Sequence, residues 1–451
     1  MTNPAPDRLN PSLTDKISGA LDDDNRGALL LAIEDAHPAD VADVLEQINA
    51  GAREDFVRLA AGDFPADVLT ELDEGLRDDI VTLVDPDYLA GAVGELDSDD
   101  AVYLVENLDD DLRREVLDAL PTADRIGIER SLEYPEDSAG RMMQRDVVTV
   151  PPFWNVGQTI DMLRSREDLP EEFYEIVVID PTYTPVGTVP LSRIMASRRP
   201  VMIEAIMNED FRKLAVDAPP QDIAYAFNQY HLVSAPVVDD GGRLAGVITI
   251  DDALEVLDEE AEEDMRLLGG VGDEELTDSV FEIARQRLPW LVVNLITAIL
   301  ASLVIAQFDA VIESIVALAI LMTIVASMGG NAGTQTLTVA VRALATKDLT
   351  TTNAMRIVGR EGLVGAFNGI VFAVVMGGLT WAWYGDPALG AVLGAAMIIN
   401  MLVAALAGIL IPIGLEKLGA DPALASAVFV TTVTDVVGFM AFLGLAAAVL
   451  L

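Results

Sequence analysis

Hydrophobic and polar positions follow three different patterns along the chain. Residues 25–135 carry apolar residues at the spacing of short amphipathic helices. Residues 134–262 alternate between short apolar runs and helix-like segments. From residue 286 onward, the chain contains apolar runs long enough to cross a membrane. The pattern therefore predicts a multidomain protein with an all-α superhelical domain, an α/β domain, a connecting acidic helix and a polytopic α-helical membrane domain.

A short pattern recurs in the first region: an aliphatic residue, an Arg five positions later, and an apolar residue three positions after that. Such a repeat predicts stacked helical hairpins, each burying one face on the next. We expect this domain over residues 25–135, after a flexible N-terminal segment, residues 1–24. His37 precedes Pro38 and has no second His or Cys nearby, so we expect a turn or cap residue. The three copies are Ile48/Arg53/Phe56, Leu72/Arg77/Ile80 and Leu108/Arg113/Val116.

The second region contains two copies of another pattern: an extended segment, a helix, a strand, a glycine turn and a second strand. The duplication predicts a pseudo-symmetric pair of α/β modules, over residues 136–202 and 203–252. No phosphate-cradling glycine loop accompanies the polar turns, which leaves nucleotide binding open. The predicted helices are 156–164 and 222–230, the strands 176–180 and 236–239, and the turns Gly187 and Gly246.

Five apolar runs of spanning length make up residues 285–451: about 288–308, 311–341, 361–383, 388–415 and 423–451. Basic residues cluster before the first run, between the second and third, and between the fourth and fifth. By the positive-inside rule, the N-terminal half is cytoplasmic and the C-terminus lies outside. These basic residues are Arg285, Arg287, Arg342, Lys347, Arg356, Arg360 and Lys417.

The net charge of −45 is confined to one part of the chain. Residues 1–284 hold 65 acidic and 21 basic residues, whereas residues 285–451 hold 8 and 7. Such an acidic half is a poor match for nucleic acid. We attribute most of the charge to the solvated surface of a protein from a high-salt environment and look for function in clustered carboxylates. The absence of Cys excludes disulfides and thiolate metal sites.

The most charged predicted helix, residues 251–268, opens the connecting segment 251–284. Asp252, Glu255, Glu259 and Glu263 recur along one of its faces. Like charges at this spacing destabilise an isolated helix by about 0.2–0.5 kcal/mol per pair. Bound divalent cations would reverse the sign of that effect. The alternative is a solvated acidic helix without ligands.

The last apolar run contains one acidic residue, Asp435, close to Thr431, Thr432 and Thr434. A carboxylate in the hydrocarbon region is costly, so such residues face a bundle interior or a wet path. Asp435 is therefore either a cation site in a pore or a structural residue bonded to a neighbouring helix. Carboxylate and hydroxyl oxygens are hard ligands that suit Mg²⁺ or Ca²⁺.

The second run contains the segment 327–336, SMGGNAGTQT. Gly329, Gly330 and Gly333 predict close helix approach or exposed backbone carbonyls. Asn331 and Gln335 add polar groups on nearly the same face.

These motifs resemble those of the MgtE family of magnesium transporters. Asp421-Pro422-Ala423, the three Thr residues, Asp435 and Gly438 match the signature of that family's last span. Residues 37–48 resemble the opening helix of its N domain, and residues 134–150 resemble the start of its pair of CBS modules. Residues 329–335 resemble its GGNxGxQ segment, and residues 360–369 resemble the start of its third span. We expect Glu361, in the last of these segments, to form a structural pair with a nearby Arg.

The resemblance implies a homodimeric, channel-like Mg²⁺ transporter of the cell membrane, embedded in the lipid bilayer, that is not an enzyme and binds no nucleic acid. It implies gating by cytoplasmic Mg²⁺ between the N domain, the CBS modules and an acidic plug helix. Because CBS pairs often bind adenine nucleotides, ATP is a candidate ligand. The metal residues that the resemblance implies are Asp435, Asp421, Asp252, Glu255, Glu260, Glu263 and Asp264, and the acidic face of the connecting helix adds Glu259. The implied pore-lining residues are Gly330, Asn331, Gly333, Ala427, Thr431, Thr432, Thr434 and Gly438.

Two positions depart from the family pattern. His231 stands where the family commonly has Asp, so one regulatory ion site does not carry over. Ala427-Val428 replaces an Asn-Pro pair, which predicts a less polar and less kinked start of the last span. Two other functions are compatible with the sequence: a CBS-regulated transporter of another divalent cation, such as cobalt, and a membrane-anchored adenine-nucleotide sensor. Ion flux in liposomes distinguishes among them.

Overall fold

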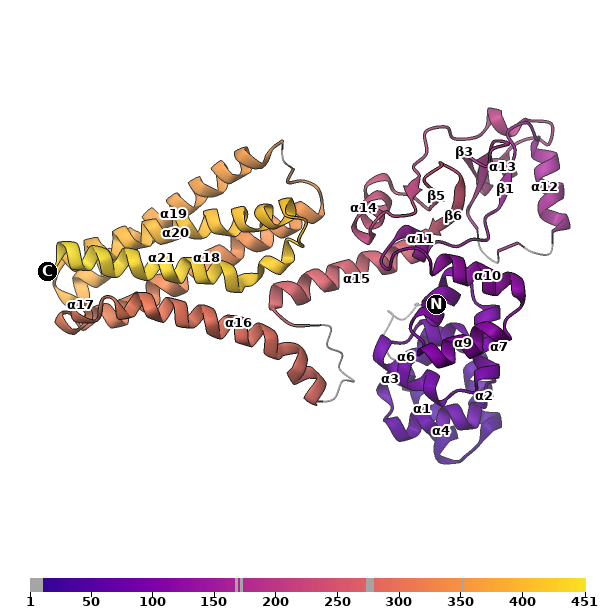
Figure 1. Ribbon diagram of the computed structural model, residues 1–451, viewed down its shortest axis with the longest axis horizontal. Coiled ribbons are helices and arrows are strands. Elements are labelled where there is room, and N and C mark those ends of the chain that lie inside the picture. The colour runs from indigo at the N-terminus through magenta and orange to yellow at the C-terminus, as the bar shows by residue number, and fades with distance from the viewer. Residues whose placement is uncertain (1–10, 167–168, 171–172, 273–279, 351) are drawn as a thin grey trace, which may run out of the picture. The chain divides into compact units, whose positions relative to one another are not determined.

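The structure is a computed structural model that describes residues 11–166, 169–170, 173–272, 280–350 and 352–451. The chain forms two compact units (Figure 1). The first unit comprises the chain up to Glu260, and the second begins at Ala261, within helix α15 (Ile250–Gly269).

In the first unit, the described residues 11–131 form a domain whose secondary structure consists of short helices. Its apolar side chains form one continuous core that includes Ile17, Phe56 and Leu89. The helices are short because polar residues stop and restart them; for example, the side chains of Asn25 and Asn49 accept hydrogen bonds from the first turns of the helices that follow. The helices are α1 (Pro11–Asp22), α2 (Arg26–Glu34), α3 (Pro38–Gln47), α4 (Ala50–Ala60), α5 (Asp67–Thr70), α6 (Glu74–Leu83), α7 (Pro86–Glu95), α8 (Ser98–Glu106), α9 (Asp110–Ala119) and α10 (Thr122–Ser131).

Helix α1 contradicts the expectation that residues 1–24 are flexible. Leu13, Ile17 and Ala20 lie at helical spacing and are buried in the core of the domain. The polar start of the chain obscured this apolar stripe. The rest of the expected flexible segment, residues 1–10, lies outside the described residues. His37 is the N-cap of α3, as expected, because its Nδ1 accepts a hydrogen bond from the Ala39 N–H at 3.3 Å.

The recurring Arg connects successive helical hairpins. Arg53, on α4, donates to the carbonyl oxygens of Leu45 and Glu46 at 2.7 and 3.1 Å. These carbonyls end α3, and the last carbonyls of a helix have no partner within the helix. Arg113, on α9, makes the same contacts with the end of α8, including the Val105 oxygen at 3.0 Å. The repeat predicted from the sequence therefore places one C-terminal cap in each of these two copies.

The copy of the repeat that contains Arg77 differs from the other two. The Arg77 side chain is 1% exposed, and its guanidinium lies 4.3 Å from the centre of the Tyr103 ring. Tyr103 is on α8, so Arg77 joins α6 to α8 by a cation–π contact.

The α/β domain contains two three-stranded sheets of identical order, β1-β2-β3 and β4-β5-β6. In each sheet, the first strand is parallel to the second, and the second is antiparallel to the third. The duplicated pattern of the sequence is confirmed. The elements are β1 (Thr149–Val150), α12 (Val156–Ser165), β2 (Glu175–Ile179), β3 (Pro185–Pro190), α13 (Leu191–Ala196), η1 (Ile203–Ala205), β4 (Leu214–Ala215), α14 (Pro220–Tyr230), β5 (Ser234–Val238) and β6 (Leu244–Thr249).

The prediction that Gly187 and Gly246 form turns is wrong, because both lie within strands, β3 and β6. A Cβ on Gly246 would lie 2.5 Å from the Gln144 carbonyl oxygen, and one on Gly187 would lie 3.1 Å from the Asn208 carbonyl oxygen. Because these glycines have no side chain, another backbone segment can lie close to each strand.

The segment before the first module packs on the second module. Short helix α11 (Ala139–Met142) hydrogen-bonds to residues 216–218, and Gln144 forms an antiparallel bridge with Val247 of β6. Conversely, residues 202–208 bridge back to the first sheet. The apolar cores accordingly divide the chain near 148 and 207, whereas the predicted modules covered 136–202 and 203–252.

The connecting helix α15 begins at Ile250 and ends at Gly269. Gly270 follows with φ of +66°, a left-handed conformation that terminates helices. The helix is therefore shorter than the expected segment 251–284, part of which, residues 273–279, lies outside the described residues.

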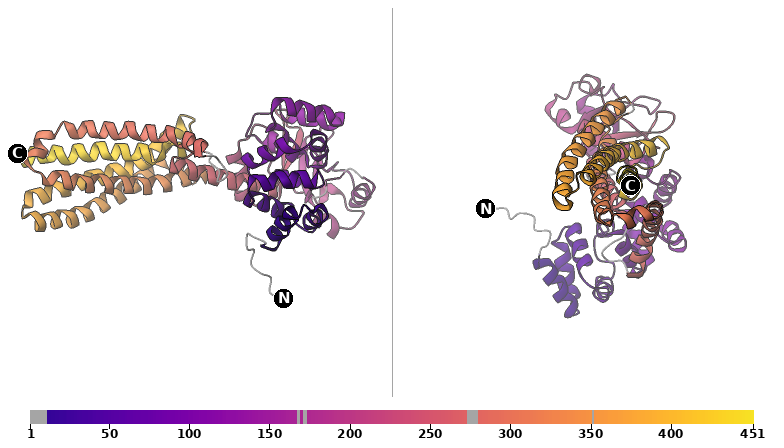
Figure 2. Two further views of the ribbon diagram at one scale, coloured as in Figure 1. Left: turned by 90° about the horizontal axis from the view of Figure 1, so that it is seen from below. Right: turned by 90° about the vertical axis from the view of Figure 1, so that its left-hand side faces the viewer.

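The second unit contains five helices that are long and apolar enough to cross a membrane, as predicted. They run side by side in Figure 1 and in the left view of Figure 2. A short helix, α17 (Asp309–Ser314), links the first two, and η2 (Ala423–Ala425) precedes the last. The five helices are α16 (Val280–Ala306), α18 (Ala317–Ala345), α19 (Ala354–Tyr384), α20 (Pro387–Lys417) and α21 (Ser426–Val449).

Glycines bring the backbones of these helices together. A Cβ on Gly408 of α20 would lie 2.6 Å from the Gly333 carbonyl oxygen of α18. A Cβ on Gly377 of α19 would lie 2.8 Å from the Gly390 carbonyl oxygen of α20. Helix α18 is continuous through residues 327–336, so its glycines permit close packing without opening the helix.

We predict that Arg113→Met, which keeps most of the aliphatic volume but removes the donors, destabilises the helical domain by about 2 kcal/mol. The cause is the loss of hydrogen bonds to three carbonyls at the end of α8. Thermal denaturation followed by circular dichroism measures the effect. Arg114→Met is the matched control, because Arg114 is exposed and bonds only within its own helix. Equal stability of the two variants would contradict this role for the repeat.

Candidate functional site

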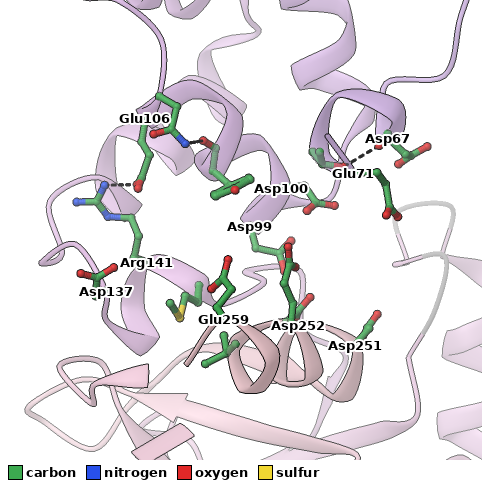
Figure 3. A pocket seen from close by; sticks show the side chains of 16 residues that line it. Asp67, Glu71, Asp99, Asp100, Glu106, Asp137, Arg141, Asp251, Asp252 and Glu259 are labelled. Carbon is green, nitrogen blue, oxygen red and sulfur yellow. Dashed lines mark hydrogen bonds and ion pairs between the residues drawn. The ribbon is translucent and has the colours of Figure 1, made fainter. Parts of the chain in front are cut away.

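A cavity of about 690 Å³ in the first unit is lined mainly by carboxylates (Figure 3). Helices α5 and α8 of the helical domain contribute one wall, residues 137–142 contribute another, and the start of α15 contributes the third. Figure 3 shows Asp99, Asp252 and Glu259 directed toward the same space. We call this cavity the acidic pocket. Its carboxylates are Asp67, Glu71, Asp99, Asp100, Glu106, Asp137, Asp251, Asp252, Glu255 and Glu259.

The most enclosed carboxylates of the acidic pocket come from two different helices. Asp99, on α8, is 9% exposed, and it lies close enough to Asp252 of α15 for the two carboxyls to interact. The Asp252 Oδ2 accepts hydrogen bonds from the Thr249 hydroxyl at 2.6 Å and the Thr249 N–H at 3.1 Å. Burial and the charge of Asp252 raise the pKa of Asp99 well above its usual range.

Neighbouring carboxyls are shifted in the same direction. Burial, followed by the charge of Asp252, raises the pKa of Asp100 to about 7. The pocket walls remove part of the hydration of Glu255, and the charge of Glu259 adds to this effect, so the pKa of Glu255 also rises to about 7. Without a cation, these carboxyls would therefore take up protons near neutral pH.

The single basic side chain that lines the acidic pocket, Arg141, does not neutralise these groups. Its guanidinium pairs with Glu106 and donates to the carbonyl oxygens of Leu132 and Tyr134, at 3.2 and 2.6 Å. The other carboxylates share one cavity, where the charge of Arg77 opposes only part of the rise in the pKa of Glu255. Protons or cations in the acidic pocket would reduce the repulsion among them.

No group of three or more His, Asp or Glu side chains within the described residues is close enough to hold a bare metal ion. The acidic pocket fits a different mode of binding. Mg²⁺ gives up its water reluctantly and commonly contacts proteins through one or two carboxylates and several retained waters. A wide cavity with carboxylates on opposite walls suits such a hydrated ion.

The structure separates the acidic residues of α15 that the sequence grouped together. Asp252, Glu255 and Glu259 line the acidic pocket. Glu260 lies outside it and accepts a hydrogen bond from Gln221 of α14 at 2.8 Å. Glu263 and Asp264 belong to the second unit.

The sequence analysis did not identify the carboxylates on the opposite wall of the pocket, of which Asp99 and Asp100 are the most enclosed. Because the chain contains 73 acidic residues, its composition gave no signal that distinguished them. His231 is the C-cap of α14 in a left-handed conformation and does not line the pocket.

A second acidic cluster lies in the second unit. Burial raises the pKa of Asp264 to about 6, and the charges of Asp421 and Glu263 add to this shift. The Asp421 Oδ1 accepts a hydrogen bond from the Ala423 N–H at 2.6 Å, which forms the Asp-Pro-Ala turn. The end of α15 and the turn before α21 therefore bring together two residues, Asp264 and Asp421, that the family resemblance implied as metal ligands.

A polar face runs along the membrane helices α18 and α21. On α18, polar residues recur every four positions, and each is exposed on the single chain. On α21, Asp435 is partly exposed one turn after Thr431. A Cβ on Gly330 would lie 3.3 Å from Thr431, so the two helices adjoin here. The exposed residues of α18 are Thr323, Ser327, Asn331 and Gln335.

Three of the residues predicted to line a pore make close contacts within the chain. Thr434 is 0% exposed and donates its hydroxyl hydrogen to the Thr431 carbonyl oxygen at 2.9 Å. Gly333 is packed against Val430, and Gly438 against Asn400. These three residues make helix contacts within one chain, so we do not include them in the polar face. Ala427 is partly exposed near the start of α21. The predicted pair of Glu361 with a nearby Arg is present, because Arg360 lies 3.4 Å from it.

Comparisons with known proteins agree with this arrangement. A family model described as a divalent cation transporter, MgtE, matches residues 322–445. The MgtE intracellular N domain matches residues 36–137, and a CBS domain matches residues 203–259. A magnesium transporter MgtE from Thermus thermophilus is 32% identical over 77% of this chain and 78% of its own length. The chain belongs to the MgtE family.

Other members of the MgtE family show similar agreement. A magnesium transporter MgtE from Enterococcus faecalis is 32% identical over 71% of this chain and 70% of its own length. The crystal structure of the cytosolic domain of the Mg²⁺ channel MgtE in complex with ATP covers 54% of this chain, with 25% identity and a TM-score of 0.51. That of the soluble part of a magnesium transporter covers 56%, with 22% identity and a TM-score of 0.50, and shows the shared fold.

We predict that protonation of the carboxylates can replace bound divalent cations in stabilising the acidic pocket. Because its carboxyls have raised pKa values, the cost of ionising them develops as pH rises from about 4 to about 7. In EDTA and constant KCl, protection of α8 and the start of α15 from hydrogen exchange, corrected for intrinsic rates, should fall between pH 5.5 and 8. Added Mg²⁺ should restore it at pH 8.

Asp99→Asn and Asp100→Asn together mimic the protonated state and should flatten this pH dependence. Asp109→Asn with Asp110→Asn, at the exposed start of α9, is the control for a change of two charges. Unchanged protection between pH 5.5 and 8 without Mg²⁺ would refute this account of the pocket.

Proposed function

We propose that this chain transports Mg²⁺ across the cell membrane through a channel-like pore shared by two copies. The observation that supports this proposal is the polar face of α18 and α21, which carries Asp435. In hydrocarbon, exposed amides and a carboxylate are costly and mark ion paths or protein interfaces. A second copy related by a two-fold axis would cover the same face with an identical one.

The ligand chemistry of the polar face suits a hydrated Mg²⁺. Asp435 supplies negative charge, and the hydroxyl oxygens of Thr431 and Thr432 supply hard ligands on the preceding turn. Both hydroxyls donate to the Val428 carbonyl oxygen, at 3.1 and 2.6 Å, so their lone pairs remain as acceptors for the waters of an ion. Two Asp435 carboxylates across the axis would balance one divalent charge.

The membrane potential supplies the driving force for uptake. It is worth about 2.3 kcal/mol per charge per 100 mV, and twice as much for a divalent ion. The distribution of basic residues supports a cytoplasmic N-terminal unit and a C-terminus outside. Uptake of Mg²⁺ is then electrically downhill, and the proposed function requires no catalytic step.

Cytoplasmic Mg²⁺ gates the pore in this proposal. Mg²⁺ in the acidic pocket bridges the helical domain and α15, and Mg²⁺ near Asp264 and Asp421 bridges the end of α15 and the turn before α21. Both bridges favour one position of α15, which acts as the plug. A ligand shifts such an equilibrium only by its difference in affinity for the two states, so several weak sites act together.

An adenine nucleotide such as ATP is a further candidate ligand of the CBS pair, supported by the related cytosolic domain in complex with ATP. The cleft between the two sheets, lined in part by Glu175, Ser234 and Thr249, has a volume of about 20 Å³. A nucleotide would therefore bind there only after the modules separate. Transport of another divalent cation, such as cobalt, remains the alternative function, and competition in a liposome flux assay distinguishes it.

We predict that Asp435→Asn lowers Mg²⁺ flux into proteoliposomes at least tenfold while the protein stays folded. The substitution preserves the side-chain shape and removes the charge that attracts the cation. Glu313→Gln is the matched control, because Glu313 is an exposed carboxylate on the short helix α17. Wild-type flux in Asp435→Asn would remove this residue from the mechanism.

We also predict that Glu255→Gln with Glu259→Gln weakens closure by Mg²⁺. The half-inhibiting concentration in patch-clamp or flux recordings should rise at least fivefold, because the α15 wall of the pocket loses two charges. Asp258→Asn with Glu262→Gln removes two charges from the same helix outside the pocket and should leave closure unchanged. Equal effects of the two pairs would mean that the helix acts only through its net charge.

A further inference from the structure

Asn400 is a completely buried amide in the middle of membrane helix α20. Its Nδ2 donates to the Val325 carbonyl oxygen of α18 at 2.8 Å. Its Oδ1 has no hydrogen-bond partner among the described residues. An amide of this kind is costly to place within an apolar bundle and makes only part of its four possible hydrogen bonds here. Its presence therefore requires an explanation beyond the filling of space.

Glycines on the two neighbouring helices form the space that Asn400 occupies. A Cβ on Gly329 of α18 would lie 2.2 Å from the Asn400 Nδ2, and a Cβ on Gly438 of α21 would lie 2.8 Å from the same atom. No real Cβ tolerates such distances. Gly329 and Gly438 thus leave a space for the Asn400 side chain, which comes from α20. We call this space the seat.

This seat lies close to the polar face. Gly329 precedes Gly330, which adjoins Thr431, and Gly438 lies one turn after Asp435 on α21. The hydrogen bond to Val325 fixes the rotation of α18 as well as its distance, because an amide donor is directional. A Leu of similar volume would fill the seat without fixing that rotation.

We propose that Asn400 is a positioning residue that holds α18 and α21 in register, so that Asn331 and Asp435 lie on adjoining turns of one polar face. The proposal rests on the proposed function, since the polar face is assigned there to Mg²⁺. Asn400 itself is buried behind that face and does not contact the ion. Gly329 and Gly438 contribute by lacking a side chain.

Compensation between substitutions tests the seat without measuring transport. Gly438→Ala and Gly329→Ala should each lower the melting temperature of the detergent-solubilised full chain. In the Asn400→Ala background, the same substitutions should cost little or raise it, because the new methyl group enters the vacated space. Gly333→Ala is the control: its Cβ would lie 2.4 Å from Val430 Cγ1 and not near Asn400, so its cost should be equal in both backgrounds. If Gly438→Ala lowered the melting temperature equally in both backgrounds, the proposed packing of Asn400 between these glycines would be wrong.

Flux kinetics test positioning. Asn400→Leu should fold, lower the maximal Mg²⁺ flux and raise the half-saturating Mg²⁺ concentration at least threefold. A merely structural role would reduce the amount of active protein and leave half-saturation unchanged.

Different results would contradict the proposed pore and the proposed positioning role of Asn400. If Asp435→Asn and Asn400→Leu both transport like the wild type while the compensation holds, the proposed pore is wrong and the seat is only structural. If Asp435→Asn abolishes flux and Asn400→Leu leaves both kinetic parameters unchanged, the positioning role is overturned and the pore stands.

Discussion

Repulsion among the carboxylates of the acidic pocket is the constraint on which the cytosolic part of this protein depends. Two unit charges 4 Å apart repel by about 4 kcal/mol at an effective dielectric constant of 20. The acidic pocket brings together ten carboxylates, and its one arginine is committed to Glu106 and two carbonyls. Protons or cations therefore favour the close approach of α8 and the start of α15. In molar salt the Debye length is about 3 Å, so an ion that bridges two walls has an effect that general screening cannot replace.

The membrane part faces a related constraint, because polar groups there have no bulk water to solvate them. Its helices meet this constraint in two ways. Some polar side chains, such as Thr434, bond to the carbonyls of their own helix. Others gather on one exposed face, where the single chain leaves Asn331 and Gln335 unburied. The glycines of α18 serve both arrangements: Gly333 allows tight packing, while Gly329 admits a polar side chain from α20.

The sequence predicted those features that depend on local periodicity. Apolar runs located the five spans, the duplicated strand–helix pattern located the two sheets, and the Arg repeat located the helical domain. It did not predict features that depend on distant segments meeting. Asp99 could not be distinguished among so many acidic residues until α15 was seen to lie against it, and the helix α1 was hidden behind a polar start. Gly246 was assigned to a turn because the segment that crowds it lies a hundred residues earlier in the chain.

The bridge between Gln144 and Val247 has a mechanical consequence. Along the covalent chain, the helical domain is separated from α15 by both CBS modules. Through the bridge, the strand that receives the incoming chain is β6, which runs directly into α15 at Ile250. The two backbone hydrogen bonds between Gln144 and Val247 thus give a pull or twist on the helical domain a short route to the connecting helix. The first module is a side branch of this route, so an insertion in it would change neither the length nor the stiffness of the connection.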